Sequence, residues 1–250
     1  MSTVGWIRVS VVAAAVAAVE LLCRGGIITR FTMIPPSEMV TALAGILASG
    51  RMSAAILRTL RIVGIALVAS IIVGFVLGAL LHALPRIRRT VDPLFATYYA
   101  IPIYAFYPLF IVLFGLGDVP ILIIGFLLAV VAMIISTLNG FDRIPPVLLK
   151  TARMYRMRRV RTALRIMMPC AAPYIFTGVK LAVAYSFIGV IGAEFIMSGS
   201  GMGYEIAFAY SNFDNQIMYP LIMLVLVLVT IINMVLHSWE KILFERRRRR

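Results

Sequence analysis

Several residue types that carry chemistry are scarce in this sequence. It contains two histidines, two cysteines and ten acidic residues, against 24 lysines and arginines. No cluster of histidines, cysteines or carboxylates has the spacing of metal ligands. A phosphate-binding loop of the form GxxxxGK followed by Ser or Thr is also absent from the sequence. We therefore expect this chain to hold no metal, to bind no cofactor and to catalyse no reaction.

Apolar residues are abundant instead. They make up 62% of the 250 residues, and the mean hydropathy is +1.01, whereas soluble domains are roughly 45–50% apolar. The formal net charge of +14 comes from basic residues between the apolar runs and in the arginines at 246–250. That pattern sets membrane topology and contacts anionic lipid headgroups, so we expect no nucleic-acid partner. The composition predicts an all-α, multi-pass membrane protein with one domain, residues 1–250.

Six apolar stretches are long enough to be read as membrane spans. They cover residues 6–22, 52–84, 92–114, 120–138, 173–197 and 217–236. Residues 39–47 predict a short amphipathic helix at the surface. Arg86, Arg88 and Arg89 mark a turn before the third span, which Pro102 is expected to kink. Within the second span, the Gly74 and Gly78 pair allows a close helix approach, and packing within the chain is favoured over a dimer seam.

The basic residues also predict an orientation. Stretches 86–89, 143–165 and 241–250 hold many arginines, whereas residues 198–216 hold acidic residues and no lysine or arginine. Cytoplasmic loops carry the excess of positive charge. We therefore expect both termini and a basic tail, residues 240–250, in the cytoplasm. Arg24, Arg30 and Arg51 fall on the outer side in this arrangement, against the rule.

Residues 150–169 form the most basic of these stretches and cannot lie in hydrocarbon. We interpret residues 146–169 as a cytoplasmic loop that binds another protein, with anchoring to anionic lipid as the alternative. The stretch resembles a signature of the permease subunits of binding-protein-dependent ABC importers. Lys150, Thr151 and Ala152 occupy its Glu-Ala-Ala place. Arg156 stands at its glycine, and Pro169 at its proline.

Other stretches resemble the sulfonate, nitrate and taurine type of that family. They are residues 101–109 and 114–117, 174–178, 193–195, 200–204 and Arg61. The resemblance implies a type I importer fold in a bacterial inner membrane, with the signature folded as a short coupling helix. It implies two ABC ATP-binding subunits, which hold the ATP and Mg, and a second permease that is either identical or similar. It also implies an external solute-binding protein and a small, anionic solute.

Two positions depart from the signature. Lys150 places a positive charge where the family has a carboxylate, so a basic partner group would be repelled. Arg156 replaces a glycine and enters a left-handed conformation only at a cost of roughly 1 kcal/mol or more. Either the helix runs on or the turn is strained. Because arginines are concentrated here, our hypothesis is that the partner ATPase has an acidic rim.

The sequence yields three groups of candidate site residues. Candidates for coupling to the ATPase are Lys150, Thr151, Ala152, Arg153, Arg156, Arg159 and Pro169. Candidates for the translocation pathway or a gate are Arg61, Tyr98, Pro102, Tyr104 and Glu194. For the tyrosines, core packing is the alternative, and for Glu194 it is a structural pair. Candidates for contact with the binding protein are Asp118, Ser200, Gly201 and Tyr204.

Two other functions remain open at this stage. An ion-driven secondary transporter or channel would show paired broken helices in two repeats, and only the segment around Pro102 fits. A degenerate half of a heteromeric permease would account for Lys150 and Arg156.

Overall fold

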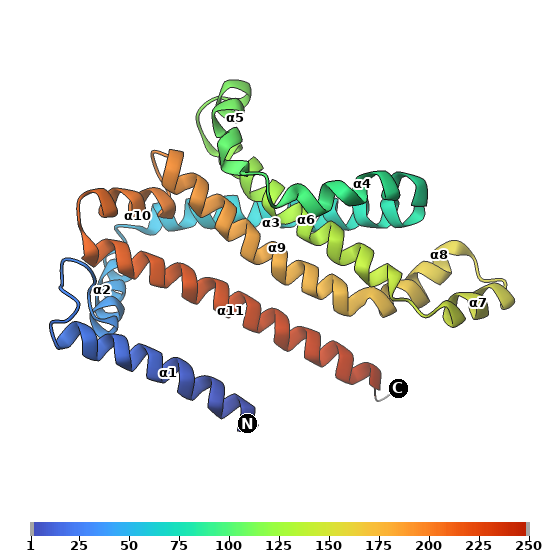
Figure 1. Cartoon of the computed structure of the whole chain (residues 1–250), viewed down its shortest axis with the longest axis horizontal. Coiled ribbons are helices and arrows are strands. Elements are labelled where there is room, and N and C mark those ends of the chain that lie inside the picture. Colours follow the sequence, from blue (N-terminus) through green and yellow to red (C-terminus); the bar gives the residue numbers. More distant parts are fainter. Residues whose placement is uncertain (1–2, 249–250) are drawn as a thin grey trace. The chain divides into compact units, whose positions relative to one another are not determined.

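The computed structural model describes residues 3–248, and every regular element in that range is a helix. Figure 1 shows the order of these elements along the chain. The helices are α1 (Thr3–Arg24), α2 (Pro36–Ser49), α3 (Ser53–Ala83), α4 (Pro85–Tyr98), η1 (Ile103–Phe106), α5 (Tyr107–Phe114), α6 (Asp118–Asp142), α7 (Pro146–Met154), α8 (Arg159–Thr162), η2 (Ala163–Met167), α9 (Met168–Met197), α10 (Met202–Ser211) and α11 (Asn215–Arg248). The all-helical membrane fold predicted from composition is confirmed.

Four helices of the described part are long and apolar enough to cross a membrane. They are Ser53–Ala83, Asp118–Asp142, Arg159–Met197 and Asn215–Lys241. The sequence predicted two more spans. The first, residues 6–22, is helical within α1, and the side chains of residues 8 and 9 lie outside the described part. The other, residues 92–114, is divided among shorter helices.

The described residues form two compact units. The first unit contains Met1–Thr59 and Glu194–Leu228, and the second contains Leu60–Ala193 and Val229–Arg250. Helices α3, α9 and α11 each run from one unit into the other. The predicted basic tail, residues 240–250, continues α11 as far as Arg248, and the side chains from residue 242 on lie outside the described part.

Glycines bring α3 and α6 of the second unit into close contact. A Cβ atom on Gly74 would lie 2.6 Å from the Cβ of Met133, and one on Gly78 would lie 2.7 Å from the Cβ of Thr137. Both pairs advance by four residues in the same direction, so the two helices are parallel. The predicted role of the Gly74 and Gly78 pair in packing within the chain is confirmed.

Helix α9 packs against α6 in the opposite direction. A Cβ atom on Gly189 would lie 2.6 Å from the Cα of Gly125, whereas one on Gly140 would lie 3.1 Å from the Cβ of Ala171. The start of α6 therefore meets the end of α9, and the end of α6 meets the start of α9. Such close approach is typical of small residues at helix interfaces in membranes.

The predicted third span is not one helix. Pro85 at the start of α4 draws Arg86, Arg88 and Arg89 into the first turns of that helix, so the predicted turn there is wrong. The helix ends at Tyr98, and η1 and α5 follow after a non-helical stretch at 99–102. Pro102 accounts for the break, because it has no N–H and disfavours helical geometry in the residue before it.

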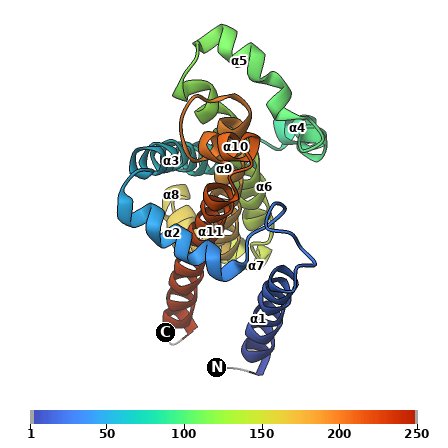
Figure 2. The same ribbon diagram turned by 90° about the vertical axis from the view of Figure 1, so that its left-hand side faces the viewer.

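In the first unit, a carboxylate fixes the start of α2. Oε2 of Glu20, near the end of α1, accepts the backbone N–H of Ser37 at 3.0 Å. Its Oε1 accepts the Ser37 hydroxyl at 2.6 Å and Nε of Arg24 at 2.6 Å. Pro36 at the first position of α2 needs no partner for its nitrogen. Figure 2 shows α2 running across the direction of α1. The predicted surface helix at 39–47 lies within α2.

Candidate functional site

Helix α7 carries most of the predicted coupling residues and is fixed to the second unit. It begins at Pro146 and contains Lys150, Thr151, Ala152 and Arg153. Ala152 is buried. Leu149 packs on a core cluster that holds Phe141 at the end of α6, Ile144 just after it, and Ala171 at the start of α9. Figure 1 shows α7 beside the ends of these two helices. The short helix implied by the family resemblance is present.

The turn after α7 settles how Arg156 replaces the glycine of the signature. Arg156 has a φ of 48°, which is the left-handed region. Its N–H donates to the carbonyl oxygen of Arg153 at 2.9 Å, and the N–H of Met157 donates to that of Ala152 at 2.9 Å. This pair of bonds is the Schellman arrangement, which usually has glycine at the left-handed position. Of the two alternatives, the helix therefore ends and the turn is strained.

The chain then becomes helical again much earlier than predicted. A continuous helix runs from Arg159 to Met197, whereas the sequence predicted a span from residue 173. Residues Ala163–Met167 form a π-turn, in which the N–H of Met168 donates to the carbonyl of Ala163. Pro169 lacks an N–H, and so the usual bonding register is interrupted at this point. The stretch 146–169, which connects two spans, consists of two helices with a short turn between them.

The surface of this segment is basic and partly apolar. Residues 146–169 contain no Asp or Glu, and the seven basic residues are Lys150, Arg153, Arg156, Arg158, Arg159, Arg161 and Arg165. All seven are exposed. Met154 and Tyr155 are also exposed, by 84% and 78%. We call this set the coupling surface. Exposed apolar side chains rimmed by charge are typical of a protein-binding site.

In the second unit, salt bridges connect both ends of α6 to neighbouring helices. Arg88 of α4 donates two hydrogen bonds to Asp142 at the end of α6, at 2.7 and 2.6 Å. These bonds raise the pKa of Arg88. Arg61 of α3 donates to Asp118 at the start of α6, at 2.6 Å. Arg61 and Asp118 were predicted for different roles. The structure brings them together at the start of α6, at the opposite end of that helix from Asp142.

The two tyrosines predicted to line the pathway anchor the broken segment. The Tyr98 hydroxyl donates to the backbone carbonyl of Leu127 in α6 at 2.8 Å. The Tyr104 hydroxyl donates to that of Ile188 in α9 at 2.7 Å. A Cβ atom on Gly192 would lie 2.4 Å from the Tyr104 hydroxyl oxygen, so glycine is needed for this contact. Pro102 directly precedes η1.

Glu194 belongs to a buried network in the first unit. Its side chain is 0% exposed. The hydroxyl of Thr59 lies 2.9 and 2.8 Å from the two carboxylate oxygens. The N–H groups of Gly203 and Met202, at the start of α10, donate to Glu194 and to the Thr59 hydroxyl at 2.9 and 2.8 Å. A negative side chain at a helix N-terminus is stabilising, so this network fixes α10 to α3 and α9.

The part that Thr59 plays in this network was not predicted from the sequence. Its only signal is a polar side chain on an apolar helix. The structure also requires Gly201, whose φ is 107° and on which a Cβ atom would lie 2.3 Å from a Glu194 oxygen.

The residues predicted to contact the binding protein at 200–204 lie close to this network. Arg58 donates to the backbone carbonyl of Ser200 and to the Ser198 hydroxyl. The ring of Tyr204 stacks on Phe208, with centroids 6.0 Å apart. The stretch 198–216, predicted as a loop, is largely helical in α10. Two aromatic side chains of that helix, Phe208 and Tyr210, are 55% and 63% exposed.

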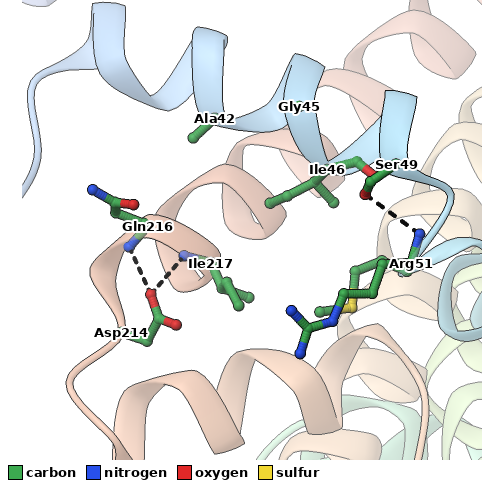
Figure 3. Close-up of a pocket in the computed structure, with 9 residues that line it drawn as sticks. Ala42, Gly45, Ile46, Ser49, Arg51, Asp214, Gln216 and Ile217 are labelled. Carbon is green, nitrogen blue, oxygen red and sulfur yellow. Dashed lines mark hydrogen bonds between the residues drawn. The ribbon is translucent and has the colours of Figure 1, made fainter.

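A pocket of about 360 Å³ opens in the first unit. Figure 3 shows the guanidinium of Arg51 reaching into it and α2 lining one side. On the opposite side, the Asp214 carboxylate accepts the N–H groups of Gln216 and Ile217, at 3.1 and 3.2 Å. Asp214 thereby caps the start of α11. The pocket offers both a positive and a negative group.

Residues 66–249 match the family described as binding-protein-dependent transport system inner membrane component. The chain belongs to this family. The resemblance predicted from the signature and the other stretches is thereby confirmed. The permease is 28% identical to a nitrate import permease protein of Leptolyngbya laminosa over 158 residues, which are 63% of this chain and 57% of the relative. It is 32% identical to a bicarbonate transport system permease protein of Synechococcus elongatus over 153 residues, 60% of this chain and 55% of the relative.

A third relative covers more of the permease. The putative aliphatic sulfonates transport permease protein of Bacillus subtilis is 24% identical over 203 residues, 81% of this chain and 74% of the relative. The matches to the nitrate and bicarbonate permeases span little more than half of those proteins. Among solved structures, the inward-facing MetNI methionine ABC transporter has a similar chain, with a TM-score of 0.63 and 17% identity. That match covers 75% of this chain and 93% of the other, and it shows the fold.

Proposed function

We propose that the permease is the membrane subunit of an ATP-driven importer for a small anion. One observation carries the proposal: the coupling surface begins on the short helix α7, which is packed on the joined ends of α6 and α9, and continues over the turn and the first turns of the helix that leads into α9. Movement of α7, when a partner protein binds it, would be transmitted directly to two membrane spans. Family membership supports the same role.

The partners in this proposal are two ABC ATP-binding subunits, which hold ATP and Mg and accept the coupling surface. A second permease, identical or similar, completes the route. ATP drives transport only through its different affinity for the inward-open and outward-open states. The coupling surface transmits that difference, because the helix and the spans it contacts form one packed element with two arrangements.

Charge complementarity would select the cognate ATPase. The coupling surface holds seven positive charges and no negative one, so a groove with an acidic rim fits it and a basic groove is repelled. Met154 and Tyr155 would enter the groove itself, because exposed apolar side chains gain most from desolvation. Lipid anchoring is the competing use of these arginines.

The solute class follows from the relatives. They are named for nitrate, bicarbonate, taurine and aliphatic sulfonates, and all of these solutes present a small oxyanion group. An external binding protein would deliver the solute to α10 and the turn before it, which carry Tyr204, Gly201 and the exposed Ser200. Asp118 of the second unit is a separate candidate contact. The pocket beside Arg51 offers that protein a site for an acidic side chain.

Reconstitution tests the proposal. The permease should co-purify with an ATP-binding subunit and, in liposomes with ATP inside, take up nitrate, bicarbonate or taurine only when the binding protein is present. The chain alone should show neither ATP hydrolysis nor uptake. Uptake driven by an ion gradient without an ATP-binding subunit would reject the scheme in favour of a secondary transporter.

Lys150 and Arg156 favour one variant of this function. A heteromeric permease tolerates a degenerate signature in one half, because the other half can supply the usual carboxylate. A second permease chain with an intact Glu-Ala-Ala signature in the purified complex would establish this variant. A complex with only this permease chain would exclude it.

A further inference from the structure

The second unit contains a pocket whose lining is unusually polar for a membrane span. Its volume is about 300 Å³, at the lower end of the range for sites that hold small molecules. Helices α6 and α9 form its walls, together with the end of α4. Its polar side chains are Tyr99, Ser136, Asn139, Tyr174, Thr177 and Tyr185.

The pocket extends from the α7 end of the spans toward their middle. Asn139 lies next to Gly140, which is level with Ala171 at the start of α9. Gly125 is level with Gly189 near the other end of α6. Ala132 and Leu181, which also line the pocket, therefore lie about half-way along the packed pair, and Tyr185 lies one turn further toward Gly189. The α7 helix is attached to the same two spans.

Several polar groups in this pocket have no hydrogen-bond partner among the described residues, although the Thr177 hydroxyl donates to the Pro173 carbonyl at 3.0 Å and the Tyr174 hydroxyl accepts from Arg143. Asn139 is exposed although most residues around it in α6 are buried. Among the residues that the structure describes, no hydrogen bond involves the Asn139 amide or the hydroxyl groups of Tyr99 and Tyr185. Polar side chains within a span are expensive in lipid and usually face a cavity or a partner. The Tyr99 and Tyr185 rings stack at 5.5 Å and hold these hydroxyls in place.

The charge around the pocket favours an anion. None of its lining residues is Asp or Glu. At the α7 end, Nη1 of Arg143 donates to the Tyr174 hydroxyl at 3.2 Å, and the guanidinium lies 5.2 Å from the centre of that ring. The pocket thus has neutral hydrogen-bond donors along its walls and a positive charge at one end. Neutral donors hold an anion weakly enough for it to leave, as a transport route requires.

From this geometry we infer that the pocket is a solute-binding segment of the translocation route, in which Asn139, Ser136 and the tyrosine hydroxyls donate hydrogen bonds to a small oxyanion. The inference rests on the proposed function and gives the solute a place within the chain. It also explains how the coupling surface reaches the solute, because α6 and α9 both hold α7 and line the pocket.

Cysteine labelling of the assembled transporter tests this site. The native Cys23 and Cys170 are replaced by alanine, and Asn139→Cys or Thr177→Cys is introduced. Ile188→Cys is the matched control, because Ile188 is 55% exposed on α9 but lies outside the pocket lining. A negatively charged methanethiosulfonate reagent should modify positions 139 and 177 several-fold faster than position 188.

Protection by solute gives the second readout. Nitrate, bicarbonate, taurine and methanesulfonate are added one at a time, with sodium chloride at the same ionic strength as the control. At least one of these oxyanions should slow labelling at both pocket positions several-fold more than chloride does. Protection by none of them, or equal labelling at all three positions, would overturn the inference. The unmodified transporter is assayed for uptake in parallel, so that failure of the proposed function is seen separately.

Discussion

Arg156 stores strain at a single residue. Its φ of 48° suits glycine, and a residue with a side chain pays roughly 1 kcal/mol there. Arg156→Gly should therefore raise the free energy of unfolding by about that amount, seen as a higher melting temperature of the purified permease. Lys150→Gly, in the middle of α7, should lower it by a similar amount, since glycine destabilises a helix interior. Equal shifts for both variants would contradict this account.

Glu194 should be the carboxylate whose loss is felt most. Glu194→Ala leaves the N–H of Gly203 without its buried acceptor, at about 1–3 kcal/mol for an unsatisfied group, whereas the Thr59 hydroxyl keeps the carbonyl of Ala55 as an acceptor. The melting temperature should fall, and the amides at the start of α10 should exchange hydrogen faster. Glu38→Gln, which breaks a surface bridge to Arg30, should change stability by less than about 1 kcal/mol. Similar effects of the two substitutions would disprove the role of the network.

Single residues were predictable only where local rules decide. Arg156 could be recognised as strained, because it stands where the resembling family has glycine. The partner of Glu194 could not be predicted, because Thr59 is 135 residues away in the sequence. Tyr98 and Tyr104 show the same limit. Their chemistry suits both packing and a pathway, and only tertiary contacts reveal that both hydroxyls donate to backbone carbonyls.

At the scale of elements, the contact of α6 with α9 depends on glycine. Gly189→Ala places a Cβ atom 2.6 Å from the Cα of Gly125, so the helices must separate. Overpacking of this kind typically costs about 1–3 kcal/mol. Gly64→Ala in α3 is the control, because a Cβ atom there meets nothing within 4 Å. Thermal unfolding should show a clear loss for position 189 and no loss for position 64. A loss at both would mean that glycine matters here for another reason.

Apolar runs predicted which elements exist, and proline positions decided where the prediction failed. The run from residue 52 to residue 84 became α3 almost unchanged, since nothing interrupts its helical period. The run from 92 to 114 was expected to be one helix with a kink at Pro102. It forms three helices instead, because the chain is not helical just before and at Pro102. The basic stretch 146–169 was interpreted as a loop from its charge, yet arginine and lysine are good helix formers and the stretch is mostly helical.

At the scale of the whole molecule, helix packing places two of the connections between helices on the same side. Helices α3 and α6 are parallel and α9 is antiparallel to them, so the α3–α4 and α6–α7 connections share a side. We expect that side to be the cytoplasm. A fluorescent reporter fused after residue 250 should fold and emit light, and a phosphatase inserted at residue 212 should be active. Phosphatase activity from the fusion after residue 250 would reverse the orientation.

The coupling surface should control assembly through charge. Replacing Arg153 and Arg159 with glutamate reverses two of its charges, so binding of the ATP-binding subunit should weaken strongly and become less sensitive to salt. Arg89→Glu, exposed on α4 outside this surface, is the control and should leave binding nearly unchanged. Co-purification at several salt concentrations measures the difference. Unchanged binding together with weaker adhesion to anionic vesicles would assign these arginines to lipid.

The backbone contact between Gly125 and Gly189 has a mechanical consequence. Where two helices touch without intervening side chains, neither can slide or rotate independently, and so α6 and α9 should move as one rigid body together with α7. Such a motion requires a flexible segment elsewhere in the chain. The stretch at 99–102 has turn hydrogen bonds, from the N–H groups of Ala100 and Ile101, in place of those of an α-helix, so bending is expected there. Stiffening that stretch should slow the change between the inward-open and outward-open states.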